Sequence, residues 1–385
     1  MARLGDIGKV ITGNTPQTSD VLNYATSEIC FVKPSDIADG MLTFLSDSEC
    51  YISEYARTRA KIVPPKSVLV TCIGTIGKVA INDIECAFNQ QINAIIPDES
   101  KCLVEYLAYA IQNKQAEMQD MANAPVVPIL NKSQFSDIEI YLPSLIEQKA
   151  VVDRISTVSK MILLRKQQLE KLDELVKSRF VELFGMPGAD EFGWGLVPLG
   201  SVCYINPKKG QDSRLSSGVE VSFVPMPAVT ERGEIDATAV KEYDEVKTGF
   251  TYFAENDVLF AKITPCMENG KGAVARGLHN GLGFGSTEFH VLRPISGKSN
   301  PYWIYTLTAF SQFREDAASN MTGSAGQRRV PALFLENYLV AVPPIELQDQ
   351  FAAFIEQTDK SKLAIQQSLD KLETLKKALM QKYFG

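Results

Sequence analysis

The sequence predicts an α+β fold in which two similar α/β domains alternate with two long helices that pair with each other. Three observations lead to this prediction. The chain of 385 residues repeats part of its sequence at an offset of 200. The repeated segments have helical periodicity, and the segments before them carry alternating, strand-like runs.

The repeat is clearest between residues 142–185 and 342–385, which align without a gap. Both copies begin with a proline followed five residues later by a glutamine, as in Pro143–Gln148 and Pro343–Gln348, and both end on Phe-Gly. Proline fits a helix only before or at its first turn, so each helix is expected to begin there. The terminal glycine is expected to end it.

Neither copy has a Gly or Pro in its body, and apolar residues recur at spacings of four and three, as in the seam of a coiled coil. A seam of this kind has to be covered, so the helices are expected to pair with each other. Two unrelated coiled coils would give the same periodicity. The seam residues are Val151, Ile155, Val158, Ile162, Leu169, Leu172, Val176 and Leu183 in the first copy, and Phe351, Ile355, Ile365, Leu369, Leu372, Leu379 and Tyr383 in the second.

The segments that precede the helices also match each other, more weakly. "SVLVTCIGTIGKVAI" (67–81) corresponds to "DVLFAKITPCMENGKGAVA" (257–275), and such β-branched runs broken by glycine predict strands joined by turns. Each segment then has a helical stretch and a short apolar strand before the proline. The predicted organisation is a domain over 1–141, a helix over 142–185, a Gly- and Pro-rich linker over 186–197, a second domain over 198–341 and a second helix over 342–385.

Composition and charge narrow the functional classes. The net charge is −7, with 11 Lys+Arg against 17 Asp+Glu in residues 1–141 and 14 against 15 in residues 198–341. A nucleic-acid-binding surface would therefore have to gather its cations on one face, or receive them from a partner. Seven scattered cysteines and two histidines do not predict a zinc site. With no secretion signal and no membrane-length apolar run, the expected location is the cytoplasm.

Four short motifs resemble catalytic sites. "GLGFG" (281–285) and "NPYW" (300–303) are reminiscent of a methyltransferase, but too few residues separate them for both to lie on one sheet. "CIGTIGKV" (72–79) and "PCMENGKG" (265–272) approach a phosphate-binding loop, but both lack its first Gly and the Ser or Thr that would hold magnesium. A turn between strands is the preferred interpretation of both, and the chain is expected to be non-catalytic.

Several phrases recur in the same order in both halves, and together they resemble a known family, the specificity (S) subunits of type I restriction–modification systems. The resemblance covers nearly all of the chain. It rests on the Pro-x-x-x-x-Gln helix starts, the "LG" openings of both domains and the phrases "TGNTP" (12–16), "VLVTCIGTIGKVAI" (68–81), "NQQINAI" (89–95), "STEFHVLRP" (286–294) and "GQRRVP" (326–331).

The resemblance implies that each globular domain is a target-recognition domain, which reads one half of a bipartite DNA site. It implies that the helices pack as an antiparallel coiled coil that sets the spacer, and the two domains differ enough in sequence to predict an asymmetric site. The implied partners are double-stranded DNA, two methyltransferase (M) subunits and restriction/translocase (R) subunits. No cofactor is expected in this chain, and S-adenosylmethionine, ATP and Mg²⁺ are expected in the partner subunits.

Polar and basic residues on the predicted turns are the candidates for DNA contact. Arg and Lys pair with guanine, Asn and Gln pair with adenine, and cations and hydroxyls hold phosphates. Each candidate could equally be a solvated or backbone-capping turn residue. They are Asn14, Thr15, Lys78, Asn89, Gln90 and Gln91 in the first domain, and Lys208, Lys209, Lys262, Lys271, Ser286, Thr287, Gln327, Arg328 and Arg329 in the second.

Two other classes of function are open at this point. A bivalent scaffold, whose globular domains bind proteins, would carry the same coiled coil but would not shift DNA in a sequence-specific way. A self-sufficient enzyme would bind S-adenosylmethionine as an isolated chain.

Overall fold

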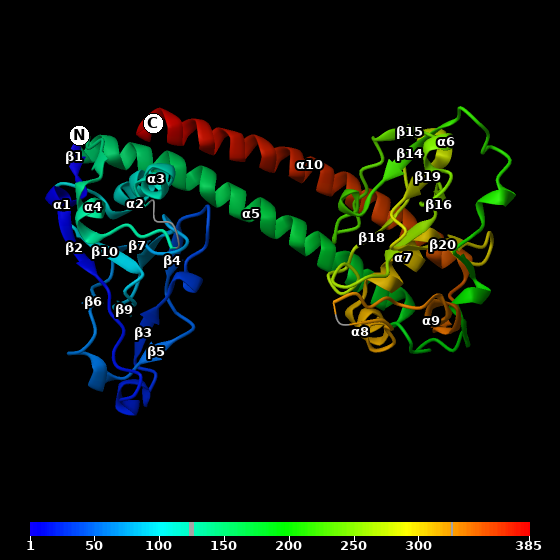
Figure 1. Ribbon diagram of the computed structural model, residues 1–385, viewed down its shortest axis with the longest axis horizontal. Coiled ribbons are helices and arrows are strands. Elements are labelled where there is room, and N and C mark those ends of the chain that lie inside the picture. Colours follow the sequence, from blue (N-terminus) through cyan, green and yellow to red (C-terminus); the bar gives the residue numbers. More distant parts are fainter. Residues whose placement is uncertain (123–126, 325) are drawn as a thin grey trace. The chain divides into compact units, whose positions relative to one another are not determined.

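The computed structural model describes residues 1–122, 127–324 and 326–385 (Figure 1). The chain divides into two compact units. The first comprises residues 1–166 with 367–385, and the second comprises residues 167–366. Each unit therefore holds one globular domain, part of the long helix that follows it in the sequence, and part of the other long helix.

The strands of the first globular domain form two main sheets. These strands are β2 (Gly8–Thr12), β3 (Ile29–Val32), β4 (Thr43–Leu45), β5 (Tyr51–Ile52), β6 (Ile62–Val63), β7 (Val68–Thr71), β8 (Val79–Asn82), β9 (Cys86–Phe88) and β10 (Ile92–Pro97). One sheet has the order β2-β10-β7-β8-β4 and the other the order β5-β3-β9-β6. Neighbouring strands are antiparallel except for the parallel pairs β4–β8 and β3–β9.

A small antiparallel pair closes this domain, because its first strand pairs with its last. Ala2 lies opposite Ile140 in the pair formed by β1 (Ala2–Arg3) and β11 (Glu139–Ile140). The helices of the domain are α1 (Leu4–Ile7), α2 (Val104–Asn113), α3 (Gln115–Met121) and α4 (Lys132–Asp137).

The second globular domain repeats this arrangement. Its strands are β12 (Leu196–Pro198), β13 (Cys203–Ile205), β14 (Glu220–Val224), β15 (Val240–Glu242), β16 (Thr251–Ala254), β17 (Val258–Ala261), β18 (Gly272–Val274), β19 (Leu282–Gly285), β20 (Phe289–Pro294) and β21 (Leu339–Ala341). The sheet orders are β13-β20-β17-β18, β15-β14-β19-β16 and β12-β21, and β14–β19 is the parallel pair. The helices are α6 (Tyr243–Val246), α7 (Pro301–Ala309), α8 (Ser311–Ser319) and α9 (Ala332–Asn337).

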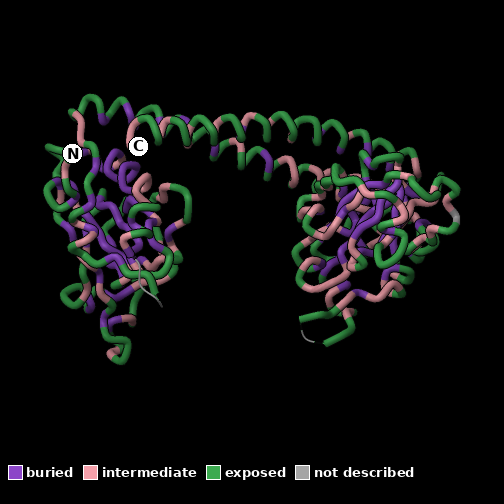
Figure 2. The backbone as a smooth tube through the Cα atoms, turned by 45° about the horizontal axis from the view of Figure 1, so that its top comes forward, coloured by how far each residue is buried: buried purple, intermediate pink, exposed green. Residues whose placement is uncertain are grey.

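The two domains share their strand order except for β4, an additional edge strand of the first domain, and the parallel pair β3–β9 of the first corresponds to β14–β19 of the second. The predicted fold class, a repeated α/β domain combined with long helices, is confirmed. The runs "VLVT" in β7 and "VLFA" in β17 are buried along their whole length, which explains why they are continuously apolar rather than alternating. Figure 2 shows the buried residues gathered inside each globular domain.

The long helices are α5 (Leu145–Phe184) and α10 (Ile345–Phe384). In the first unit, the start of α5 contacts the end of α10: Arg154 bonds to the Tyr383 hydroxyl, and Lys166 Nζ lies 3.1 Å from Glu373 Oε1. In the second unit, Lys362 in the first half of α10 lies 2.6 Å from Asp173 in the second half of α5. Within each unit the two helices are therefore antiparallel, and the predicted seam residues are buried or half-buried.

The glutamine of the repeated helix start is a buried anchor. Gln148 has 0% of its surface exposed; its Oε1 accepts a hydrogen bond from the amide of Leu103 at 2.8 Å. Its Nε2 donates to the carbonyls of Lys101 and Pro143, both at 2.9 Å. The side chain thus ties the first turn of α5 to the loop that starts α2.

Gln348 makes the matching set of bonds in the second unit. Its Oε1 accepts from the amide of Asn300 at 2.8 Å, and its Nε2 donates to the carbonyls of Lys298 and Pro343. The Pro-x-x-x-x-Gln pattern therefore specifies the same hydrogen-bonded connection in both units, between a domain and the long helix that follows it.

The terminal Phe-Gly of each helix also has a structural role. Phe184 packs edge-on against Phe351 in the second unit, and Phe384 lies against Tyr106 with ring centroids 5.1 Å apart in the first. Each long helix thus ends on an aromatic residue that packs in the globular unit of the other repeat. Gly185 then takes a positive φ of 76°, which favours glycine and ends α5.

Several details differ from the sequence-based expectations. The expected helical stretches are each split in two, into α2 and α3 and into α7 and α8, and the short helices α4 and α9 were not anticipated. The first residues of β12 lie in the segment assigned to the linker. "GLGFG" is largely the buried strand β19, where a Cβ on Gly283 would come within 2.2 Å of the Phe253 ring. "NPYW" is the capped start of α7.

In the part of the chain that the structure describes, no helix combines the length and apolarity needed to cross a membrane. The same residues contain no group of three or more His, Cys, Asp or Glu side chains arranged to hold a metal ion.

Candidate nucleic-acid interface

In the first unit, two loops that carry predicted DNA-contact residues lie side by side. The loop after β2 (residues 13–16) meets the turn between β9 and β10 (residues 89–91), because the amide of Asn14 donates to a β9 carbonyl at 3.1 Å. Thr15 Oγ1 donates to Gln90 Oε1 at 2.8 Å, and both side chains are exposed. The fold therefore brings together candidates that are far apart in the sequence.

The other three candidates in this cluster hold the loops in shape. Asn89 is buried, donates to Gln91 Oε1 at 2.9 Å and accepts from the Gln91 amide at 3.1 Å. Asn14 donates to the carbonyl of Arg59 and accepts from the amide of Lys61, both at 2.7 Å. Because the fold uses these amides, the exposed threonine and glutamine are better placed to contact a ligand.

Lys78 lies apart from that cluster, on the β7–β8 connection. Its Nζ is 3.3 Å from the carbonyl of Pro34, to which it donates, and its side chain is half-buried. This contact ties the connection to the segment that follows β3, so Lys78 has a structural partner in the folded chain.

Two exposed cations beside the cluster escaped the sequence analysis. Arg59 and Lys61 flank the hydrogen bonds to Asn14, and the Arg59 guanidinium lies 4.1 Å from the centroid of the Tyr55 ring. They supply positive charge at this point of an otherwise acidic domain. The signal was the alternating basic run "RTRAK" (57–61).

In the second unit, Glu288 is the centre of the predicted contact residues. Arg329 donates to both of its carboxylate oxygens at 2.9 Å, which holds the pKa of Glu288 below its usual value. The amide of Lys262 donates to the Glu288 carbonyl at 2.9 Å, and the Ser286 hydroxyl accepts from the Glu288 amide at 3.2 Å. Arg329 is therefore held in a fixed orientation at this surface.

The neighbouring candidates are held more loosely. The exposed Arg328 has its guanidinium 3.9 Å from Glu268, while its carbonyl accepts from the amide of Thr264. Thr287 and Gln327 are exposed on the same connections. Of these residues, Arg328 is the cation most available to a phosphate.

The remaining three lysines are Lys271, whose carbonyl accepts from the amide of Ala261 next to Lys262, and the adjacent pair Lys208 and Lys209. Lys271 precedes β18, and its amide donates to the carbonyl of Cys266 at 3.0 Å. Lys209 donates to the carbonyl of Lys247, and its neighbour Lys208 is exposed. Among the described residues, no recorded hydrogen bond or ion pair joins Lys208 or Lys209 to the Glu288 cluster.

His290 holds in place the segment that carries Arg329. Its Nε2 lies 2.8 Å from the carbonyl of Val330, so this nitrogen carries the proton, and Nδ1 accepts from Asn206 Nδ2 at 3.0 Å. Burial lowers the pKa of the imidazole. A neutral histidine held on both sides is a structural link rather than a general base.

Four deeply buried thiols are equally unsuited to catalysis. Burial raises the pKa values of Cys72, Cys86, Cys102 and Cys203 to about 12, which suppresses the nucleophilic thiolate. What the two surfaces offer instead is amides, hydroxyls and guanidinium groups on firmly held turns, the chemistry of a binding site for nucleic acid.

Comparisons with known proteins agree with this chemistry. Residues 1–174 and 192–376 match the family model described as the type I restriction modification DNA specificity domain. The EcoEI type I restriction enzyme specificity subunit of Escherichia coli is 44% identical over 154 residues, which cover 40% of this chain and 25% of that protein. The MjaIX specificity subunit of Methanocaldococcus jannaschii is 23% identical, covering 99% of this chain and 91% of that protein.

The fold has solved counterparts. The S subunit of a type I restriction-modification system from M. genitalium aligns over 100% of this chain and 95% of its own, with a TM-score of 0.55 and 13% identity. A chain from a study of complex assembly and conformational transition in a type I R-M system aligns over 100% and 96%, with a TM-score of 0.54 and 17% identity. At sequence identities of 13% and 17%, these two alignments show a similarity of fold alone.

Proposed function

The chain belongs to the type I restriction modification DNA specificity family, and from this premise we propose that it recognises DNA for a type I restriction–modification complex. Each globular domain reads one half of a bipartite site. The observation that carries the proposal is a fold whose shared strands repeat in the same order but whose equivalent turns have different residues. One turn has the sequence Asn89, Gln90 and Gln91, and the other has Ser286, Thr287 and Glu288.

The difference between these turns supports an asymmetric site. Amides favour adenine, whereas a carboxylate can accept from the cytosine amino group and an arginine can pair with guanine. Glu288 and Arg329 together could therefore select a different half-site from the glutamines of the first domain.

The long helices set the spacer between the half-sites. Helical rise of about 1.5 Å per residue makes a 40-residue helix roughly 60 Å long, which can span more than one turn of duplex DNA. The antiparallel contacts within each unit support a paired, stiff element.

Catalysis belongs to partner subunits in this proposal. Two methyltransferase subunits would bind S-adenosylmethionine and modify the site, and restriction/translocase subunits would use ATP and Mg²⁺. The neutral histidine and the buried thiols support a non-catalytic role for this chain.

An electrophoretic shift assay tests the proposal. The complex of this chain with the methyltransferase subunit of the same system should shift a DNA pool, and sequencing of the bound fraction should yield one gapped, asymmetric motif. A complex that binds all sequences equally, or none, would favour the bivalent protein scaffold instead.

A further inference from the structure

The first unit has a cavity of about 630 Å³ where its globular domain meets the first half of α5 and the last part of α10. All of the lining residues belong to this unit. Binding sites for small molecules typically have volumes of about 300–1,000 Å³, so the cavity has room for an organic ligand. None of the residues predicted to contact DNA lines it.

Positive charge dominates the walls of this cavity. Among the lining residues that the structure describes, four are lysines and a single one is acidic. The acidic residue, Glu373, already lies 3.1 Å from the lysine Lys166. The other three lysines have no recorded ion pair, and they are Lys160, Lys376 and Lys377.

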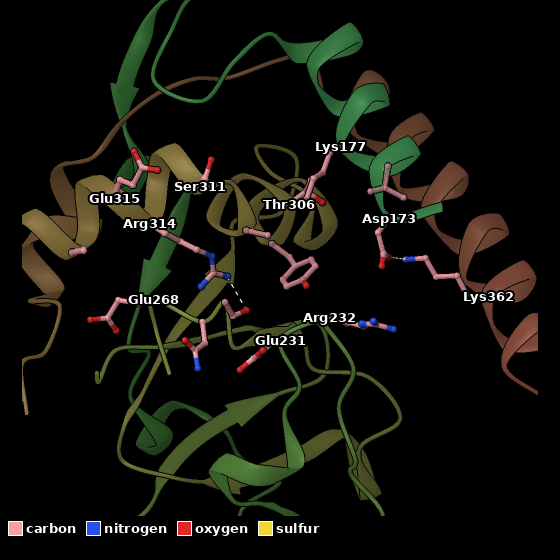
Figure 3. Close-up of a pocket in the computed structure, with 16 residues that line it drawn as sticks. Asp173, Lys177, Glu231, Arg232, Glu268, Thr306, Ser311, Arg314, Glu315 and Lys362 are labelled. Atoms are coloured by element: carbon pink, nitrogen blue, oxygen red, sulfur yellow. Dashed lines mark hydrogen bonds and ion pairs between the residues drawn. The ribbon is translucent and has the colours of Figure 1, made fainter. Parts of the chain in front are cut away.

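The matching cavity of the second unit, about 520 Å³ in volume, is electrically balanced. It is lined by four basic and four acidic side chains, all of them labelled in Figure 3. One of its acids, Asp173, pairs with Lys362 across the two helices. The excess of cations is therefore a property of the first unit and is not imposed by the repeat.

Lys376 is the residue that most clearly distinguishes the two cavities. At the matching position of the repeat, at an offset of 200, the first helix has Val176, a predicted seam residue that lines the second cavity. Lys376 is half-buried, and burial together with the charge of Lys166 lowers the pKa of its ammonium group. A lysine at an apolar seam position weakens helix packing, so its presence indicates a role other than packing.

The same cavity has an apolar wall, built largely from the segment around β4. Met41 and Phe44 line the cavity and are 43% and 56% exposed, and Leu163 of α5, which is 47% exposed, joins them. β4 is the edge strand that has no counterpart in the second domain. The first domain therefore has an additional segment that leaves large apolar side chains uncovered beside a group of lysines.

Gln112 adds a specific polar group to this wall. The residue lies on α2 and lines the cavity, and its Oε1 is buried without a recorded hydrogen-bond partner in the described chain. A buried acceptor without a partner is unfavourable, so a ligand that donates an N–H or O–H to it would be bound more tightly.

We infer that this cavity binds a small amphipathic anion, an organic molecule with an apolar body and a carboxylate or phosphate group. The body packs against Met41, Phe44 and Leu163, and the anionic group pairs with Lys376 and the other unpaired lysines. The inference goes beyond the proposed function and does not depend on it.

Fluorescence titration of the full-length chain with anilinonaphthalene sulfonate tests this. The probe is an aromatic anion with an N–H donor, and its emission rises when it leaves water. We expect saturable binding that naphthoate or naphthyl phosphate reverses. These two competitors share one apolar body, so the stronger of them identifies the preferred anionic group.

Lys376→Val separates the effect of charge from that of apolar contact, because the matching position of the repeat already has a valine. The variant should bind the probe about tenfold more weakly, since a half-buried cation is lost, while the unliganded chain melts at the same or a higher temperature. Phe44→Ala should weaken binding through the apolar wall. Lys371→Val, at an exposed position of α10 outside the cavity, is the matched control and should bind as the wild type does.

Equal or tighter binding of the probe by Lys376→Val would show that the probe follows apolar surface alone, and would overturn the inference. The absence of saturable binding to the wild-type chain would overturn it as well. If the methyltransferase subunit of the same system displaces the probe and neither naphthalene anion does, the cavity binds a segment of a partner protein and the inference is wrong.

Discussion

At the scale of single residues, the second domain presents its two adjacent arginines in different ways. Arg329 is fixed by two hydrogen bonds to Glu288, while Arg328 is exposed and only loosely near Glu268. A rigid guanidinium is suited to bidentate recognition of a base, and a loose one to a phosphate. The sequence places both on a turn, but the carboxylate that distinguishes them is 41 positions away from Arg329.

Removal of both arginines should weaken DNA binding by the assembled complex. Arg328→Ala alone should reduce the slope of log affinity against log salt by about 0.9, the value for one phosphate contact. Arg329→Ala should also weaken selection at one base position, because it leaves Glu288 unpaired. Titrations over a salt series measure both effects, with Lys371→Ala as the control. An unchanged affinity and slope in the double variant would remove both residues from the interface.

The neutral state of His290 leads to a prediction of how the free energy of unfolding depends on pH. Its pKa is lowered in the folded chain, so it contributes stability above the ordinary histidine value of 6.5, and that stability is lost as the pH falls through the folded pKa. His290→Gln, whose amide can still donate to Val330, should flatten the fall in unfolding free energy below pH 6.5. Denaturant titrations at several pH values check this.

At the scale of elements, the repeated helix start is the feature that sequence and structure share most fully. The sequence predicted two helices that begin after Pro143 and Pro343, and they begin at Leu145 and Ile345. It did not reveal why the glutamine recurs, because its partners lie on a loop about 45 residues earlier.

Loss of the glutamine should destabilise the unit that contains it. Gln348→Leu removes three hydrogen bonds at a fully buried position and should cost about 1–3 kcal/mol for each backbone group left unpaired. Gln357→Leu, at an exposed position of the same helix, is the matched control. Calorimetric melting would contradict the anchor role if both variants unfolded at the same temperature.

Helix direction is a further element-scale property that periodicity alone does not contain. A heptad seam fits parallel and antiparallel pairs alike, so the antiparallel expectation came from the family resemblance. Short elements were also invisible: α4 and α9 have six residues each, and each buries a single large apolar side chain, Phe135 or Leu335. One side chain makes no periodic pattern.

The spacer hypothesis predicts the result of lengthening both helices together. One heptad inserted after Lys166 and another after Gln366, at the boundaries of the compact units, preserves the seam and the contacts inside each unit. Seven residues add about 10.5 Å, or roughly three base pairs. Sequencing of methylated sites should therefore show the same half-sites with a longer gap. An unaltered gap would contradict the role of the helices as a spacer.

At the scale of the whole molecule, the internal repeat explains which structural features the two halves of the chain share and which features differ between them. The order of the shared strands and the glutamine anchors are the same in the two halves, while the turns proposed to read DNA differ. The order of the domains and helices could be predicted because the sequence of each domain and each long helix occurs in two similar copies. The cations Arg59 and Lys61 were missed because only the folded chain places them beside Asn14.

The central claim is that each domain independently specifies one half of a gapped DNA motif. Genome-wide mapping of N6-methyladenine tests it most directly, in cells that express the methyltransferase subunit with either the wild-type chain or a variant in which Ser286, Thr287 and Glu288 are replaced by alanine. The account predicts a bipartite motif for the wild type, and a variant motif that is relaxed in one half only. A motif altered in both halves, or the same motif in cells without this chain, would contradict it.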